Sequence, residues 1–119
     1  MGATSYEDLE VWKYGFVVTM AIYRWTREFP REEKFGLGMQ MRKAAVSIVA
    51  NIAEGFGRRK PNDKARFYNI AEGSAEELGC LVLVASGLQY GKVPDSLRDT
   101  LKSTAKMLRR LTDVTLGDP

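Results

Sequence analysis

Residues 37–57, LGMQMRKAAVSIVANIAEGFG, contain the strongest structural pattern in the chain. Large apolar side chains recur at Leu37, Met41, Ile48 and Ile52, a spacing typical of one face of an α-helix. Alanine and valine fill positions between them, and small side chains allow a neighbouring helix to approach closely. We therefore expect these residues to form the most enclosed helix of a helical bundle.

Segments on both sides of this helix have the same periodicity, and none shows the apolar–polar alternation of a strand. Short turns join the segments, so successive helices should run antiparallel. The sequence thus predicts one all-α domain over residues 1–119, an antiparallel up-down-up-down four-helix bundle. Its helices are expected at residues of about 6–28, 37–56, 61–89 and 94–114.

Local signals indicate where these helices begin and end. Ser5 is a suitable N-cap for the first helix. Pro61 suits the first turn of the third helix, with Asn62 or Asp63 as its cap. The glycines within residues 55–57 predict a left-handed residue at the end of the second helix.

The first helix carries two apolar stripes, which is more than a single bundle core requires. Either one stripe faces the core and the other a partner subunit, or both belong to one wide core, and the sequence leaves both readings open. One stripe is Leu9, Trp12, Phe16, Met20 and Tyr23, and the other is Val11, Tyr14, Val18, Ile22 and Trp25.

Composition excludes several classes of protein. The chain has no histidine and a single cysteine, Cys80, so one chain holds no disulfide framework and no histidine-based zinc site or nucleophile system. Cys80 is expected to be an inert small residue beside the core. No apolar run is long enough to cross a bilayer, and the first residues do not resemble a signal peptide. We therefore expect a cytoplasmic protein without membrane contact.

A group of polar side chains lies within the second and third helical segments. A catalytic role would need a carboxylate acting beside a hydroxyl, whereas a structural role needs only mutual hydrogen bonds that fix the helix register. Glu54 and Glu77 are a conceivable carboxylate metal pair, but the histidine of the known di-metal bundles is missing. The structural role is favoured, with no catalytic residue, metal or cofactor expected, for Ser47, Asn51, Glu54, Ser74 and Glu77.

Basic side chains are concentrated in the second half of the chain. Residues 1–57 carry seven basic and seven acidic side chains, whereas residues 58–119 carry eleven and eight, so the net charge of +3 belongs to the second half. Such clusters can neutralise phosphates, although interleaved aspartates also fit an ordinary solvated face. Tyr68 and Tyr90 are candidates for stacking on bases. The candidate nucleic-acid-binding residues are Arg58, Arg59, Lys60, Lys64, Arg66, Arg98, Lys102, Lys106, Arg109 and Arg110.

Two motifs resemble those of a known family. The motifs are QMRKAAVSIVANIAEGFGR at residues 40–58 and FYNIAEGSAEEL at residues 67–78, with YEDLEVWKYG at residues 6–15 and FPREEKFGL at residues 29–37 in agreement. They resemble the four-helix-bundle proteins encoded in intervening sequences of 23S rRNA genes. That family usually continues with acidic and polar residues where Gly79 and Cys80 stand here.

The resembled family is itself similar to the accessory variability protein of diversity-generating retroelements. That accessory protein is a basic bundle that forms a pentameric barrel and works with a reverse transcriptase and nucleic acid. The resemblance therefore implies a homopentamer, contact with RNA or DNA, and a reverse transcriptase as a possible partner.

Taken together, residues and resemblance predict a non-enzymatic, self-assembling helical bundle that binds nucleic acid or a nucleic-acid enzyme. The alternative is a purely structural or protein-interaction bundle without affinity for nucleic acid.

Overall fold

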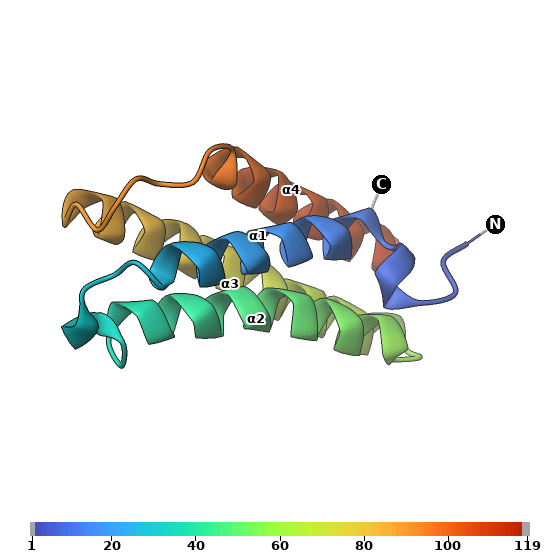
Figure 1. Cartoon of the computed structure of the whole chain (residues 1–119). Coiled ribbons are helices and arrows are strands. Elements are labelled where there is room, and N and C mark those ends of the chain that lie inside the picture. The colour runs from blue at the N-terminus through green and yellow to red at the C-terminus, as the bar shows by residue number, and fades with distance from the viewer. Residues whose placement is uncertain (1, 118–119) are drawn as a thin grey trace.

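The computed structural model describes residues 2–117, and in this range the chain forms four α-helices, two short 3-10 turns and no strand. The α-helices are α1 (Glu10–Thr26), α2 (Leu37–Gly57), α3 (Pro61–Gly87) and α4 (Leu97–Thr115). Figure 1 shows them side by side, each antiparallel to the one before it, in an elongated body of 44 × 23 × 21 Å. The prediction of an all-α, up-down-up-down four-helix bundle is confirmed.

The helices form a closed ring in which each one packs against two neighbours, α1 on α2, α2 on α3, α3 on α4 and α4 on α1. The contact between α2 and α3 is the most extensive of the four. The α2 positions predicted to face the core, Met41, Ile48 and Ile52, have no solvent exposure. Since burying one such side chain contributes about 1.5–3 kcal/mol, this helix supplies a large share of the stability.

One apolar stripe of α1 forms most of its contact with the core, and Leu9 and Trp12 of the other stripe also pack against that core. Val11, Val18, Ile22 and Trp25 are buried, and Gly15 lets α2 approach them closely. The second stripe is only partly covered, because Phe16 is 44% exposed. α1 thus leaves aromatic surface beside its contact with α2.

The first helix begins later than its sequence pattern predicts. Ser5 is an N-cap as expected, and with Asp8 it forms a capping box, but the turn it caps is the 3-10 segment Tyr6–Asp8. Leu9 is extended, with ψ of 128°, so α1 starts at Glu10. Hydrogen bonds from Thr4 and Ser5 also lower the pKa of the Asp8 carboxyl. This acidic turn is therefore a separate segment that precedes α1.

The end of α2 differs from the glycine cap that we predicted. Gly57 is the last helical residue, and among residues 2–117 only Gly91 and Gly117 are glycines with positive φ. Instead, Lys64 Nζ donates to the carbonyls of Gly55 and Phe56 at 3.3 and 2.7 Å. A lysine from the next helix therefore provides the cation and donor that the last carbonyls of α2 need.

The N-termini of α3 and α4 also correct the prediction. α3 starts with Pro61 as expected, but its N-cap is Lys60, without a side-chain cap, rather than Asn62 or Asp63. α4 begins only at Leu97, because Ser96 is left-handed, with φ of 65°.

The connection between α3 and α4 is attached to the opposite side of the bundle. Trp25 Nε1 donates to the Tyr90 carbonyl at 2.9 Å, and Tyr90 donates its phenolic hydrogen to Glu33 Oε2 at 2.9 Å. The Glu33 carboxylate raises the pKa of Tyr90, because it accepts a hydrogen bond from the neutral phenol. Glu33 lies in the second 3-10 turn, Arg31–Glu33, so one set of contacts joins both connections at this end.

None of the helices within residues 2–117 is both long enough and apolar enough to cross a membrane.

Candidate nucleic-acid interface

Three of the five predicted polar residues meet at the contact between α2 and α3. The hydroxyl oxygens of Ser47 and Ser74 lie 2.7 Å apart, and Asn51 Nδ2 donates to the backbone carbonyl of Ser47 at 2.8 Å and to its hydroxyl at 3.0 Å. Ser74 is buried, while Ser47 and Asn51 are partly buried. These bonds satisfy the hydroxyls and fix the register of the two helices.

The two glutamates lie outside this group. Glu54 is exposed and pairs with Arg58 at 3.3 Å, and Glu77 is exposed. Within residues 2–117, no three or more Cys, Asp or Glu side chains come together as metal ligands could. Cys80 is exposed, so the prediction that it packs beside the core is wrong.

The basic residues after α2 surround the connection to α3. Arg58 and Arg66 each place a guanidinium 4.6 Å from the centre of the Phe67 ring. Lys64 differs from the others, because its ammonium group is bound to the carbonyls at the end of α2. Arg59 and Lys60 are exposed and, within residues 2–117, are in none of the ion pairs. They are the cations at this end with most freedom to bind an anion.

The basic residues of α4 are exposed but have acidic neighbours. Lys102, Lys106 and Arg109 line a groove between α3 and α4 together with Glu72 and Glu76. Two glutamates in the same groove partly offset the positive potential there.

The basic residues near the two ends of α4 differ in their acidic neighbours. Arg98 lines hollows that also contain Glu76, Asp95 and Asp99. Arg110, near the C-terminal end of α4, is exposed and lines neither of these hollows. Figure 1 shows that the last turns of α4 and the connection between α2 and α3 lie at the same end of the bundle. The exposed cations Arg59, Lys60 and Arg110 therefore lie at this end, which also holds the acidic turn Tyr6–Asp8.

The two tyrosines proposed for base stacking do not present free rings. Tyr68 is 3% exposed, and burial raises the pKa of its phenol. Tyr90 is partly buried and bound to Glu33. The aromatic ring with the greatest exposure among the described large hydrophobic residues is Phe35, at 76%.

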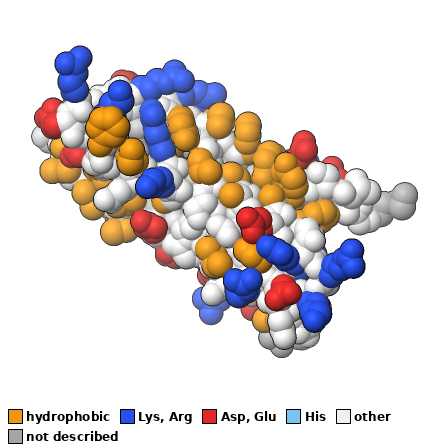
Figure 2. Space-filling model, turned by 90° about the horizontal axis from the view of Figure 1, so that it is seen from below, with side chains coloured by type: hydrophobic (Ala, Val, Ile, Leu, Met, Phe, Trp, Pro, Cys, Tyr) orange, Lys and Arg blue, Asp and Glu red, His pale blue; other side chains and the backbone are white. Residues whose placement is uncertain are grey.

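A second group of cations, which the sequence analysis missed, lies at the other end of the bundle. Figure 2 shows Lys and Arg side chains at both ends of one face, separated by a broad hydrophobic area. This second group of cations consists of Arg27, Arg31, Lys34, Arg42 and Lys43. Arg42 is held in place, because its Nε donates to Thr26 Oγ1 at 2.8 Å and its Nη2 donates to the Tyr23 carbonyl at 3.2 Å. The first half of the chain is electrically neutral in sum, and this balance concealed the local excess.

The helices and their polar contact define the class of the protein as a four-helix bundle with a basic end. The chain belongs to the 23S rRNA-intervening sequence protein family, whose model matches residues 7–111. No curated protein matches the chain.

Proposed function

We propose that this protein is a non-enzymatic, self-assembling bundle that binds nucleic acid through the end formed by the connection between α2 and α3 and the last turns of α4. The observation that carries the proposal is the exposure of Arg59, Lys60 and Arg110 at one end of the molecule. Cations grouped in this way neutralise several phosphates together, and each counterion released adds to the affinity at low salt.

Self-assembly is supported by apolar surface that the monomer leaves uncovered. Phe16 of α1, Val46 of α2 and Leu88 of α3 are each more than 40% exposed, and Figure 2 shows hydrophobic side chains spread over much of one face. A contiguous apolar area of this kind is typical of a protein interface. A ring of subunits would also repeat the basic end and strengthen weak phosphate contacts through avidity.

The family and the resemblance of residues 40–58 and 67–78 described above suggest the partners. RNA or DNA is the direct ligand in our proposal, and an enzyme that acts on nucleic acid, such as a reverse transcriptase, is the protein partner. The second candidate is a structural or protein-interaction bundle without affinity for nucleic acid, and the acidic residues in the α3–α4 groove, Glu72 and Glu76, favour it.

A salt titration with single- and double-stranded RNA and DNA separates the two candidates. We expect dissociation constants in the range of about 10⁻⁴–10⁻⁶ M that rise steeply with salt, because the contacts are to phosphates. Binding below detection at about 50 mM salt would support the protein-interaction bundle instead.

Reversing the charge at Arg59, Lys60 and Arg110 to glutamate is expected to weaken binding at least about tenfold and to reduce the salt slope by about two to three units. The matched control is Arg24, Lys92 and Arg98 to glutamate, three exposed cations outside this end that give the same net charge. Equal losses in both variants would show that only net charge matters, and would contradict the assigned surface. Circular dichroism checks that helicity is retained.

Light scattering at micromolar concentration tests self-assembly. We expect a mass of several times 13.4 kDa, with five times that value for a pentamer. A monomer at this concentration would remove the oligomer from the proposal while leaving the nucleic-acid titration open to its own result.

A further inference from the structure

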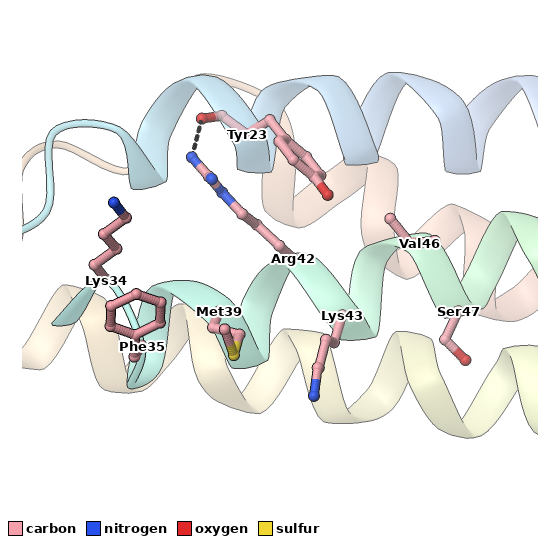
Figure 3. A pocket seen from close by; sticks show the side chains of 8 residues that line it. All are labelled: Tyr23, Lys34, Phe35, Met39, Arg42, Lys43, Val46 and Ser47. Carbon is pink, nitrogen blue, oxygen red and sulfur yellow. Dashed lines mark hydrogen bonds between the residues drawn. The ribbon is translucent and has the colours of Figure 1, made fainter.

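The end of the bundle that holds the α1–α2 connection contains a hollow that the proposed interface does not use. It has a volume of about 530 Å³ and lies over the exposed side of α2, with Tyr23 of α1 and Lys34 and Phe35 of the connection at its edges. A second hollow of about 340 Å³ shares Lys34 and Arg42 with it. Figure 3 shows Arg42 extending from α2 towards the backbone of Tyr23.

Arg42 is held in place for binding an anion. Two of its N–H groups are used by Thr26 and the Tyr23 carbonyl, and its guanidinium lies 4.6 Å from the centre of the Tyr23 ring. Since a guanidinium has five N–H donors, three remain. A side chain already fixed in this way loses little conformational entropy when an anion binds.

Cations line both hollows around Arg42. Lys34 and Lys43 line the same hollow, Arg27 and Arg31 line the adjoining one, and neither lining includes an aspartate or glutamate. Within residues 2–117, these five cations are in none of the ion pairs. This contrasts with the α3–α4 groove, where Glu72 and Glu76 lie among the basic residues. The hollow therefore has the less compensated positive charge of the two.

The remaining walls are apolar and include a free aromatic face. Phe35 is 76% exposed, and Lys34 Nζ lies 5.5 Å from the centre of its ring. Met39 of α2 adds apolar surface beside it, and Val46 lines the hollow farther along α2. An aromatic ring next to cations is the arrangement by which proteins stack a base and bind its phosphate, and stacking contributes about 1–3 kcal/mol per base.

We propose that this hollow binds one nucleotide unit, with the phosphate on Arg42 and Lys34 and the base against Phe35. The unit can be a free nucleotide or part of a single strand. The site lies at the opposite end of the bundle from the proposed nucleic-acid interface and does not depend on it.

Titration of the full-length protein with AMP, adenosine and inorganic phosphate tests the site, with the methyl resonance of Met39 and calorimetry as readouts. Because charge and ring act together, we expect AMP to bind at least about tenfold more tightly than either part alone, and its base to shift the Met39 methyl resonance. An affinity for inorganic phosphate equal to that for AMP would overturn the proposal. So would a Met39 methyl resonance that AMP does not shift.

Phe35→Leu keeps an apolar side chain and removes the ring, and it is expected to weaken AMP binding at least about tenfold, as stacking is lost. Phe16→Leu is the matched control, because Phe16 is also exposed, at 44%, but lies outside the hollow. Lys34→Gln should weaken the binding of AMP and of phosphate alike. Because Lys34 is exposed, the fold should be retained. Unchanged AMP binding in Phe35→Leu, or equal losses in both phenylalanine variants, would overturn the site.

A single-stranded pentanucleotide of adenosine distinguishes the two sources of the ligand. Binding at least tenfold tighter than AMP, and lost in Phe35→Leu, would identify a strand, whereas affinity equal to that of AMP would identify a free nucleotide. The glutamate variant at Arg59, Lys60 and Arg110 should bind AMP normally, so failure of the nucleic-acid interface and failure of this site give different results.

Discussion

Replacing Ile48 by alanine is expected to lower the free energy of unfolding by about 2–5 kcal/mol, the largest effect that we predict for a single substitution. Ile48 has no solvent exposure. Its Cγ2 atom lies only 3.2 Å from where a Cβ on Gly15 would be, so it fills the close contact between α1 and α2. Alanine would leave a cavity that two packed helices can close only in part. Urea unfolding followed by circular dichroism measures the loss.

Ile48→Val provides the graded control for this prediction. It removes one methyl group and is expected to lower the free energy of unfolding by about 0.5–1.5 kcal/mol. If Ile48→Ala lowers it by no more than Ile48→Val, the contact between α1 and α2 is not packed as described.

Gly55→Ala is expected to destabilise the protein by about 1–3 kcal/mol, although alanine is the better helix former. A Cβ at this position would lie 2.6 Å from Tyr68 Cε1 and 3.2 Å from the Lys64 carbonyl oxygen. The Tyr68 ring is buried, so it cannot move away without disturbing its neighbours. α2 and α3 would have to separate at this end. The free energy of unfolding in urea is again the measurement.

Gly73→Ala is the matched control, because a Cβ on this helical glycine would have no atom within 4 Å. It is expected to stabilise the protein by about 0.5–1 kcal/mol through helix propensity. The two glycine substitutions should therefore have opposite signs. A stabilising Gly55→Ala would contradict the close packing of α2 against α3.

The order and number of helices could be predicted from the sequence because apolar periodicity depends on burial, and burial dominates the stability of a bundle. The ends of the helices could not be predicted equally well. At the end of α2 the partner of the free carbonyls is Lys64, a side chain of the next helix, and no local pattern indicates it. At the start of α4 the left-handed Ser96 delays the helix beyond Pro94.

Site residues were predictable where they depended on one helix face. The spacing of Ser47 and Asn51 places both on one side of α2, and Ser74 meets them across the contact with α3. The second group of cations depends on which side chains from α1, the connection and α2 converge in space. Lys34 and Arg42 are separated along the chain, and the acidic residues Glu28, Glu32 and Glu33 before them balance the charge of the segment. Only the fold shows that one of these acids, Glu33, binds Tyr90 and lines neither hollow.

The hydrogen bonds of Trp25 and Tyr90 have a consequence for how the bundle opens. They join the connection before α4 to α1 and to the 3-10 turn that holds Glu33, so this connection detaches only if two tertiary hydrogen bonds break. The last turn of α4, near Thr115, has no such bond within residues 2–117. Since local opening begins where the fewest contacts are lost, thermal fluctuations should release α4 progressively from its C-terminal turn, which carries part of the basic end.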